Sequence, residues 1–272
     1  FPGAAVCVAA DNVSLDGMQV AANLGDGFFV TGKKASLSNT VSLFNGGNGI
    51  TLSGGSASLS NVVASLNLNK YGIEISSGQN TITAGSKITH NGMGGIHIAS
   101  GKTANAISQT IIFGNDNGEG GKGIILEEGA NGNISSPQPT TALNYDSETG
   151  AVTGFIPGAG VIEAFWAESK NIAAGKETQG HYFIPGAVSG GKIEITDQDL
   201  KDASNKADLG SKSKIFFTFT VTDANGNTSA FSPAFAYPFP DKDGDGVEDA
   251  QDNCLNTKNA DQKDTDDDKV GD

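Results

Sequence analysis

The chain has 272 residues, which is enough for two or three domains, each with its own core. Apolar residues make up only 37% and Gly occupies 38 positions, a composition that disfavours a compact globular enzyme and is normal for repetitive, turn-rich β-structure. The net charge is −14 and every basic residue is Lys, so the surface is a poor partner for nucleic acid, and no run of 18 apolar residues offers a membrane span.

Residues 5–135 repeat with a period of 22–23 residues. A Gly followed by alternating apolar side chains recurs at Gly27, Gly49, Gly72, Gly95 and Gly123. A second, apolar column comprises Leu15, Leu37, Leu59, Ile82 and Ile107, and a third comprises Asn23, Asn45, Asn67, Asn91 and Asn115. Three short strands per period, stacked in register, would bury the alternate apolar side chains in one shared core. We therefore expect about five to six stacked coils, with the Asn side chains hydrogen-bonded from coil to coil at one corner.

This pattern, Asn-x-x-x-Gly-Ile-x-Ile, resembles the right-handed parallel β-helix superfamily, and the resemblance implies such a domain over residues 1–136. The longest period contains the insertion Asp116–Gly121, which we expect to bulge as a loop. The chain begins at Phe1 rather than Met, in the position of a strand, so we expect earlier coils or a cap, and any targeting signal, to be missing.

The repeat stops near residue 134, and Pro137 and Pro139 mark a boundary. Beyond it we expect strands over residues 151–156, 161–167, 192–196 and 214–222. The last segment alternates between an apolar face and a face rich in Thr, which predicts a strand buried on one side only. Residues 219–232 resemble the end of bacterial immunoglobulin-like domains, and residues 161–166 resemble an earlier strand of them. The resemblance implies an Ig-like β-sandwich over residues 137–238, acting as a spacer.

The acidic tail has the spacing of calcium ligands. Residues 241–272 hold twelve of the 31 acidic side chains and only four of the 17 Lys. Carboxylates recur at every second position, and Gly246 stands where the loop must turn sharply. Oxygen ligands at this spacing surround a cation of calcium size, whereas without a cation the packed carboxylates repel each other. The alternative interpretation is a disordered acidic linker.

Asp252-Asn253-Cys254 and Asn259-Ala260-Asp261-Gln262 resemble the thrombospondin type 3 repeat, and the resemblance covers residues 239–272. It implies calcium ligands from the side chains of Asp241, Asp243, Asp245, Asp249, Asp252, Asp264, Asp266, Asp268 and Asp272, and from the carbonyls of Val247 and Val270. It also implies that Cys254 pairs with a Cys of a neighbouring repeat, a partner that we expect truncation to have removed. Lys269 replaces the turn Gly of the second loop, which we expect to weaken that loop.

Glu74 and His97 are the candidate catalytic pair. They occupy one outward column on neighbouring coils, about 4.8 Å apart, where a carboxylate beside an imidazole is suited to proton transfer. His90 lies near the Asn turn of the preceding coil, and His181 is isolated in the sandwich. Against catalysis, the coils carry no paired Asp residues, and the chain has no Arg to hold a uronate carboxylate in bidentate fashion. The expected role of Glu74 and His97 is therefore a solvated cross-strand pair.

The sequence thus predicts an all-β chain: a right-handed parallel β-helix, an Ig-like β-sandwich and an irregular calcium-binding repeat tail. The predicted function is a non-catalytic structural or adhesive module of a secreted or cell-surface protein, at the bacterial outer membrane. Its predicted partners are calcium ions and either surface glycans or other cell-surface proteins. The alternative is a polysaccharide-active β-helix lyase or hydrolase with accessory domains.

Overall fold

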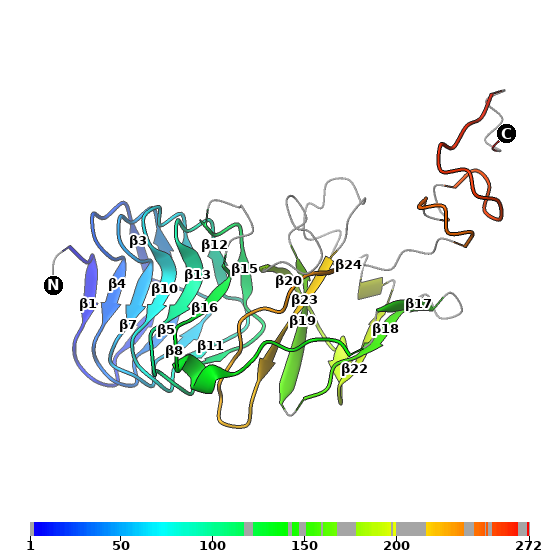
Figure 1. Cartoon of the computed structure of the whole chain (residues 1–272). Helices are drawn as coiled ribbons and strands as arrows, with labels where there is room; N and C mark the ends of the chain where they lie inside the picture. Colours follow the sequence, from blue (N-terminus) through cyan, green and yellow to red (C-terminus); the bar gives the residue numbers. More distant parts are fainter. Residues whose placement is uncertain are drawn as a thin grey trace.

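The computed structural model describes residues 3–116, 122–140, 143–146, 151–158, 160–167, 178–196, 198–199, 216–236, 242–247, 249, 252–265 and 271. The chain is all-β: a parallel β-helix comes first, antiparallel sheets follow, and a tail of turns lies outside both (Figure 1). The β-helix expected from the repeat is therefore confirmed. Within the described residues, no helix has the length and apolar character needed to cross a membrane.

Three parallel sheets run along the β-helix. Sheet A contains β1 (Val6–Val8), β4 (Phe28–Val30), β7 (Ile50–Leu52), β10 (Tyr71–Ile75), β13 (Gly94–Ile98) and β16 (Ile124–Leu126). Sheet B contains β2 (Ser14–Asp16), β5 (Ser36–Ser38), β8 (Ser58–Ser60), β11 (Thr81–Ile82) and β14 (Ala106–Ile107). Sheet C contains β3 (Gln19–Ala21), β6 (Val41–Leu43), β9 (Val63–Ser65), β12 (Lys87–Thr89) and β15 (Ile111–Phe113).

The strands stack in the register that the repeat predicts. On sheet B, Leu37 pairs with Leu15 on one side and with Leu59 on the other. On sheet A, Ile73 pairs with Ile50 and Ile96. These side chains lie in one continuous core that runs along the coils, because successive residues of a strand point to opposite faces and the apolar ones point inward.

The Asn column forms the expected ladder at the corner between sheet C and sheet A. Asn67 Nδ2 donates to Asn91 Oδ1 at 2.8 Å, and Asn91 Nδ2 donates to Asn115 Oδ1 at 2.9 Å. Each Asn backbone N–H donates to the same oxygen, so one amide oxygen satisfies two buried donors of the preceding coil. The ladder ends outside the β-helix, on Gln179 Oε1, which accepts from Asn115 Nδ2 at 2.8 Å.

A second ladder, which we did not predict, lies at the corner between sheet A and sheet B. Asn80 Nδ2 donates to Asn105 Oδ1 at 2.8 Å, and the Asn105 backbone N–H donates to Asn131 Oδ1 at 3.1 Å. Asn131 lies in the 3-10 helix η2 (Ala130–Asn133), and its Nδ2 donates to the carbonyl of Thr228 at 2.8 Å. Both ladders therefore continue by hydrogen bonds into the segment that follows the coils.

Two four-stranded antiparallel sheets follow and share one core. The first contains β17 (Asn144–Asp146), β18 (Ala151–Phe155), β22 (Lys192–Thr196) and β21 (Val188–Ser189). The second contains β20 (Gly180–Ile184), β19 (Val161–Ala167), β23 (Phe216–Thr222) and β24 (Phe235–Ala236). Trp166 and Phe217 lie at the centre of this core, with ring centroids 5.3 Å apart.

The outer face of the second sheet closes the end of the β-helix. Phe165 and Phe231 belong to the core cluster of the coils, and their rings meet edge to face at 5.3 Å. Thr218 pairs with Phe165 in the ladder of β19 and β23 and is 0% exposed. The expectation that β23 is buried on one side only is therefore wrong. Its Thr face meets the last coil instead of water, and the Thr218 hydroxyl donates to the Ser232 carbonyl at 2.8 Å.

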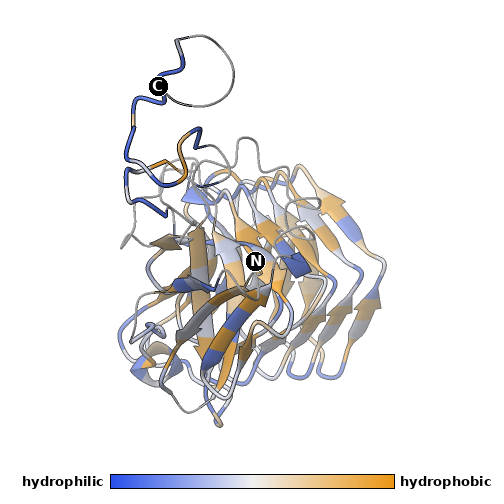
Figure 2. Cartoon of the chain, turned by 90° about the vertical axis from the view of Figure 1, so that its right-hand side faces the viewer, coloured by the Kyte–Doolittle hydropathy of each residue, from blue (hydrophilic) through white to orange (hydrophobic). Residues whose placement is uncertain are grey.

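The tail is hydrophilic and is built from turns (Figure 2). Two hydrogen bonds join its turns to one another: Asn253 N–H donates to Gln262 Oε1 at 2.8 Å, and Asn259 N–H donates to Asp245 Oδ2 at 2.8 Å. Gly246 has φ +93°, a left-handed conformation that agrees with the sharp turn expected at this position. Cys254 forms no disulfide in the described part of the chain, so the expected pairing with a neighbouring repeat stays a prediction.

Candidate functional site

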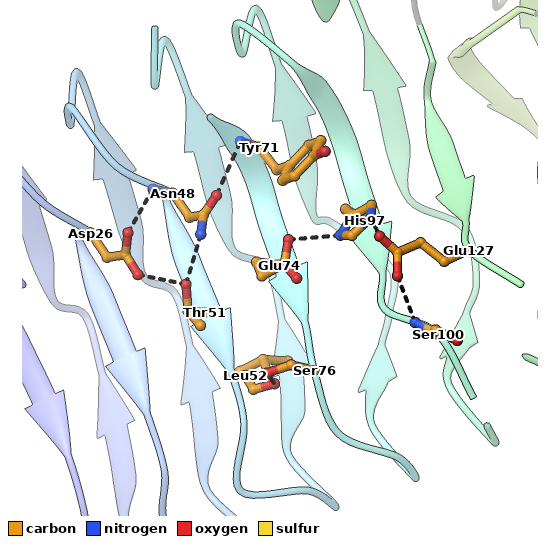
Figure 3. Close-up of polar contacts among 10 residues, drawn as sticks. All are labelled: Asp26, Asn48, Thr51, Leu52, Tyr71, Glu74, Ser76, His97, Ser100 and Glu127. Atoms are coloured by element: carbon orange, nitrogen blue, oxygen red, sulfur yellow. Dashed lines mark hydrogen bonds and ion pairs between the residues drawn. The ribbon is translucent and has the colours of Figure 1, made fainter. Parts of the chain in front are cut away.

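The outward face of sheet A carries a His held between two carboxylates (Figure 3). His97, on β13, has its Nδ1 2.8 Å from Glu74 Oε2 and its Nε2 3.1 Å from Glu127 Oε1. Glu127 follows β16 and is itself oriented by the Ser100 N–H, which donates to its Oε2 at 2.9 Å. When the imidazole is protonated, each ring N–H donates to one carboxylate, so the arrangement suits the imidazolium form.

Tyr71 covers this cluster. Its ring stacks on the His97 imidazole with centroids 4.5 Å apart and planes 7° from parallel. The hydrogen bond to Glu74 raises the pKa of His97, against the opposing effect of burial, and the charge of Glu127 raises it further. Burial raises the pKa of the Tyr71 phenol, and the negative charges of Glu74, Glu127 and Asp116 add to the shift. The site thus favours a cationic His under a neutral Tyr ring.

A second polar network lies beside the first on the earlier coils. Thr51 Oγ1 donates to Asp26 Oδ2 at 2.6 Å and accepts from Asn48 Nδ2 at 3.1 Å. Asn48 Oδ1 in turn accepts from the Tyr71 backbone N–H at 3.1 Å. Tyr71 therefore joins the two networks into one polar strip along sheet A, which runs from Asp26, before β4, to Glu127, after β16 (Figure 3).

The structure confirms that Glu74 and His97 are direct neighbours and corrects their expected role. The Cα atoms pair in register, but His97 is only 8% exposed. The Tyr71 ring lies over the imidazole and shields it from water, whereas the Glu74 side chain stays partly exposed. Sequence reasoning missed Glu127 because the long last period separates it from the repeat columns, although the register of His97 with Ile125 places Glu127 two residues beyond the column.

The other two His residues lie away from this site and pack against Phe113. His90 meets the Phe113 ring edge to face at 5.3 Å, on the outside of the Asn corner. His181, on β20, stacks on the Phe113 ring with centroids 4.0 Å apart. His181 is therefore part of the contact between the β-helix and the sheets that follow.

The predicted calcium ligands lie partly outside the described residues. These are Asp241, Asp266, Asp268, Val270 and Asp272. Of the described ligands, Asp245 Oδ1 accepts the Val247 N–H at 2.8 Å and Asp249 Oδ1 accepts the Lys242 N–H at 2.7 Å. The part of the chain that the structure describes has no group of three acidic, His or Cys side chains gathered to hold a metal ion. The described side chains therefore do not by themselves form a calcium site, and the metal assignment rests on the sequence spacing alone.

Comparison with known proteins gives a distant structural likeness. No family model matches the chain, and no curated protein matches it. Among solved structures, the crystal structure of pectate lyase Pel9A matches at 19% sequence identity with a TM-score of 0.34. The match covers 36% of this chain and 27% of that chain. The β-helix described above rests on the strand register and not on this likeness.

Proposed function

We propose that this chain is a stiff structural or adhesive module of a secreted or cell-surface protein. The observation that carries the proposal is the unbroken hydrogen bonding from the coils into the antiparallel sheets, through Asn115 to Gln179 and Asn131 to Thr228. A shared apolar core supports it at the same junction. Such a junction resists bending, because bending would expose apolar surface and break buried hydrogen bonds together.

We call the β-helix together with the antiparallel sheets the rod. The test measures the distribution of distances between the two ends of this rod. Spin labels at Ser14 on β2 and at Lys192 on β22, two exposed strand positions, should give one narrow distance peak. A Gln179→Ala variant should broaden that peak, because the last rung of the ladder is lost. A broad distribution in the unmodified chain would contradict a stiff module.

In this proposal residues 137–238 form an Ig-like spacer, and residues 239–272 form a thrombospondin type 3-like linker that calcium orders. The support is the Asp spacing and the positive φ of Gly246. Titration calorimetry should detect at least one calcium site, which Asp243→Ala and Asp245→Ala each remove. Asp266→Ala and Asp268→Ala should have smaller effects. Absence of calcium binding, or binding by the second loop alone, would make the tail a plain linker.

The Glu74–His97–Glu127 cluster supports a second candidate function, cleavage of acidic polysaccharides. A His with a raised pKa between carboxylates is a feature of proton-transfer sites. However, both ring nitrogens already face carboxylates, which leaves neither nitrogen open to a substrate. We therefore expect no unsaturated products or new reducing ends from pectate, alginate or polygalacturonate. Cleavage that Glu74→Gln or His97→Ala abolishes would establish the enzyme instead.

A further inference from the structure

Sheet A ends on β16 with an unpaired strand edge. Ile96 pairs with Ile124, and the Ile96 N–H donates to the Gly123 carbonyl at 2.9 Å. Because backbone groups alternate between the two edges of a strand, Gly123 and Ile125 bond to β13, and the N–H and C=O groups of Ile124 and Leu126 point away from it. Among the described residues, these outward backbone groups have no hydrogen-bond partner.

The other two sheets of the β-helix are covered at this end. On sheet B, Thr228 Oγ1 accepts the Ile107 N–H of β14 at 2.8 Å. On sheet C, His181 of β20 stacks on Phe113 of β15. The antiparallel sheets thus take the place of a next coil at sheets B and C, whereas sheet A has no such substitute within the described part of the chain.

The edge of β16 opens into a trench of about 330 Å³. Besides β16, the trench is lined by Ser136 and Gln138, after the last coil, and by Phe231 and Pro233, before β24. Its volume lies in the range of ligand pockets, about 300–1,000 Å³. Lys122 is the one charged side chain among the described lining residues, so the trench offers little to a polyanion, which needs many cationic contacts.

Leu126 leaves apolar surface in this trench. It continues an inward-facing column in which Leu52, Ile75 and Ile98 are each 0% exposed. Leu126 itself is only half-buried, because β16 is the last strand of the sheet. A side chain on a next strand would cover Leu126 as Leu126 covers Ile98. The trench therefore lacks both the backbone partners and the apolar side chain that a next strand supplies.

We propose that this trench binds an extended peptide segment of another protein, which adds to β16 as a further strand of sheet A. Unpaired N–H and C=O groups at strand spacing select a polypeptide backbone, and an alternating sequence places an apolar side chain on Leu126. A neutral glycan lacks the regular row of amide donors and carbonyl acceptors that this edge matches. The inference rests on the adhesive role proposed above and gives that role a partner class and a surface.

The test is NMR of the full chain with the blocked peptide N-acetyl-Thr-Val-Thr-Val-Thr-amide. Binding should slow the solvent exchange of the Ile124 and Leu126 amides about tenfold or more, and should leave the amide of Ile125, which already bonds to β13, unchanged. N-methylation of the Val residues and N-methylation of the Thr residues should have different effects, because these two sets of N–H groups lie on opposite edges of the peptide. One methylated peptide should still bind, and the other should not.

Ser136→Trp, which places a bulky ring in the trench, should weaken binding of the peptide about tenfold or more. Ser135→Trp is the matched control, because Ser135 is an exposed neighbour that does not line the trench. Equal weakening in the two variants would overturn the assignment. Equal binding of both methylated peptides, or equal binding of the neutral glycan maltohexaose, would overturn it too.

Absence of peptide binding, or protection that does not include β16, would also overturn the proposal. In that case a narrow distance peak between spin labels at Ser14 and Lys192 would still support the stiff module. Failure of the peptide site and failure of the proposed function are therefore distinguishable.

Discussion

At the scale of single residues, His97 makes the stability of the rod depend on pH. Its pKa is raised above the ordinary value of 6.5, chiefly by the hydrogen bond to Glu74. The stabilisation by the imidazolium is therefore complete below about pH 6.5 and is lost as the pH rises through the folded-state pKa. We expect His97→Gln to cost about 1 kcal/mol more at pH 6 than at pH 9, after allowance for solvent screening. Urea unfolding at both pH values measures this, and a cost that grows toward high pH would contradict it.

Glu163 is the opposite case, a carboxylate whose charge destabilises the fold. It lies on β19 at the junction, 8% exposed, and its Oε2 accepts the Gln109 N–H at 2.9 Å. Burial raises its pKa above the ordinary 4.5, so stability falls as the pH rises from the unfolded-state to the folded-state pKa.

We therefore expect Glu163→Gln, which keeps the acceptor, to stabilise the chain at pH 7 by about 1 kcal/mol. The gain should vanish near pH 4, where both forms are neutral. Thermal unfolding at the two pH values checks this. Glu163→Ala, which removes the acceptor, is the control and should destabilise at both.

At the scale of elements, the buried Asn ladder at the corner of the coils contributes to the stability of the β-helix. Asn67 is 0% exposed and accepts both the backbone N–H and the amide of Asn45. Asn67→Ala leaves these donors buried without a partner, so we expect a loss of about 3 kcal/mol in the free energy of unfolding. Asn69→Ala, at an exposed position of the same turn, should change it by less than about 0.5 kcal/mol. Equal losses in chemical denaturation would show that the ladder does not contribute.

The element scale also shows what the sequence could predict. The residue columns of sheets A and B were predictable, because a strict period places residues of the same type beside each other on successive coils. The second ladder was not predictable, because its column reads Val13, Ala35 and Ala57 and changes to Asn only at Asn80. Burial of the Thr face of β23 was not predictable either, since alternation shows which side is apolar but not what covers the other side.

The candidate site could likewise be predicted only in part from the sequence. The pairing of Glu74 with His97 came directly from the register, whereas the contributions of Tyr71 and Glu127 depend on side-chain direction and on a period of unusual length. The spacing of the Asp residues predicted which side chains bind calcium. The described part of the tail does not bring a complete set of these ligands together and does not test the prediction. The domain boundaries at residues 136 and 238 likewise stay predictions.

At the scale of the whole molecule, the antiparallel sheets act as the cap of the β-helix. Phe231 packs into the core of the coils, and its ring meets Phe165. We expect Phe231→Ala to destabilise the chain by about 3–5 kcal/mol, because it opens a cavity at the junction. In hydrogen exchange, the amides of β15 and β16 should lose protection before those of β7. Phe155→Ala, at a 46% exposed position, is the control, and uniform loss along the coils would contradict a local cap.

The regular register has a consequence for how the length of such a rod can change. Removing residues 45–66 would join Phe44 to Asn67 and bring Asn23 next to Asn67, so every column would find an equivalent partner. The product should be one coil, about 4.8 Å, shorter and otherwise alike. Removing half as many residues would place strand positions against turns and turn core side chains toward water. Length can thus vary only in whole steps of one coil, and duplication or loss of a 22-residue segment is the simplest change that preserves the fold.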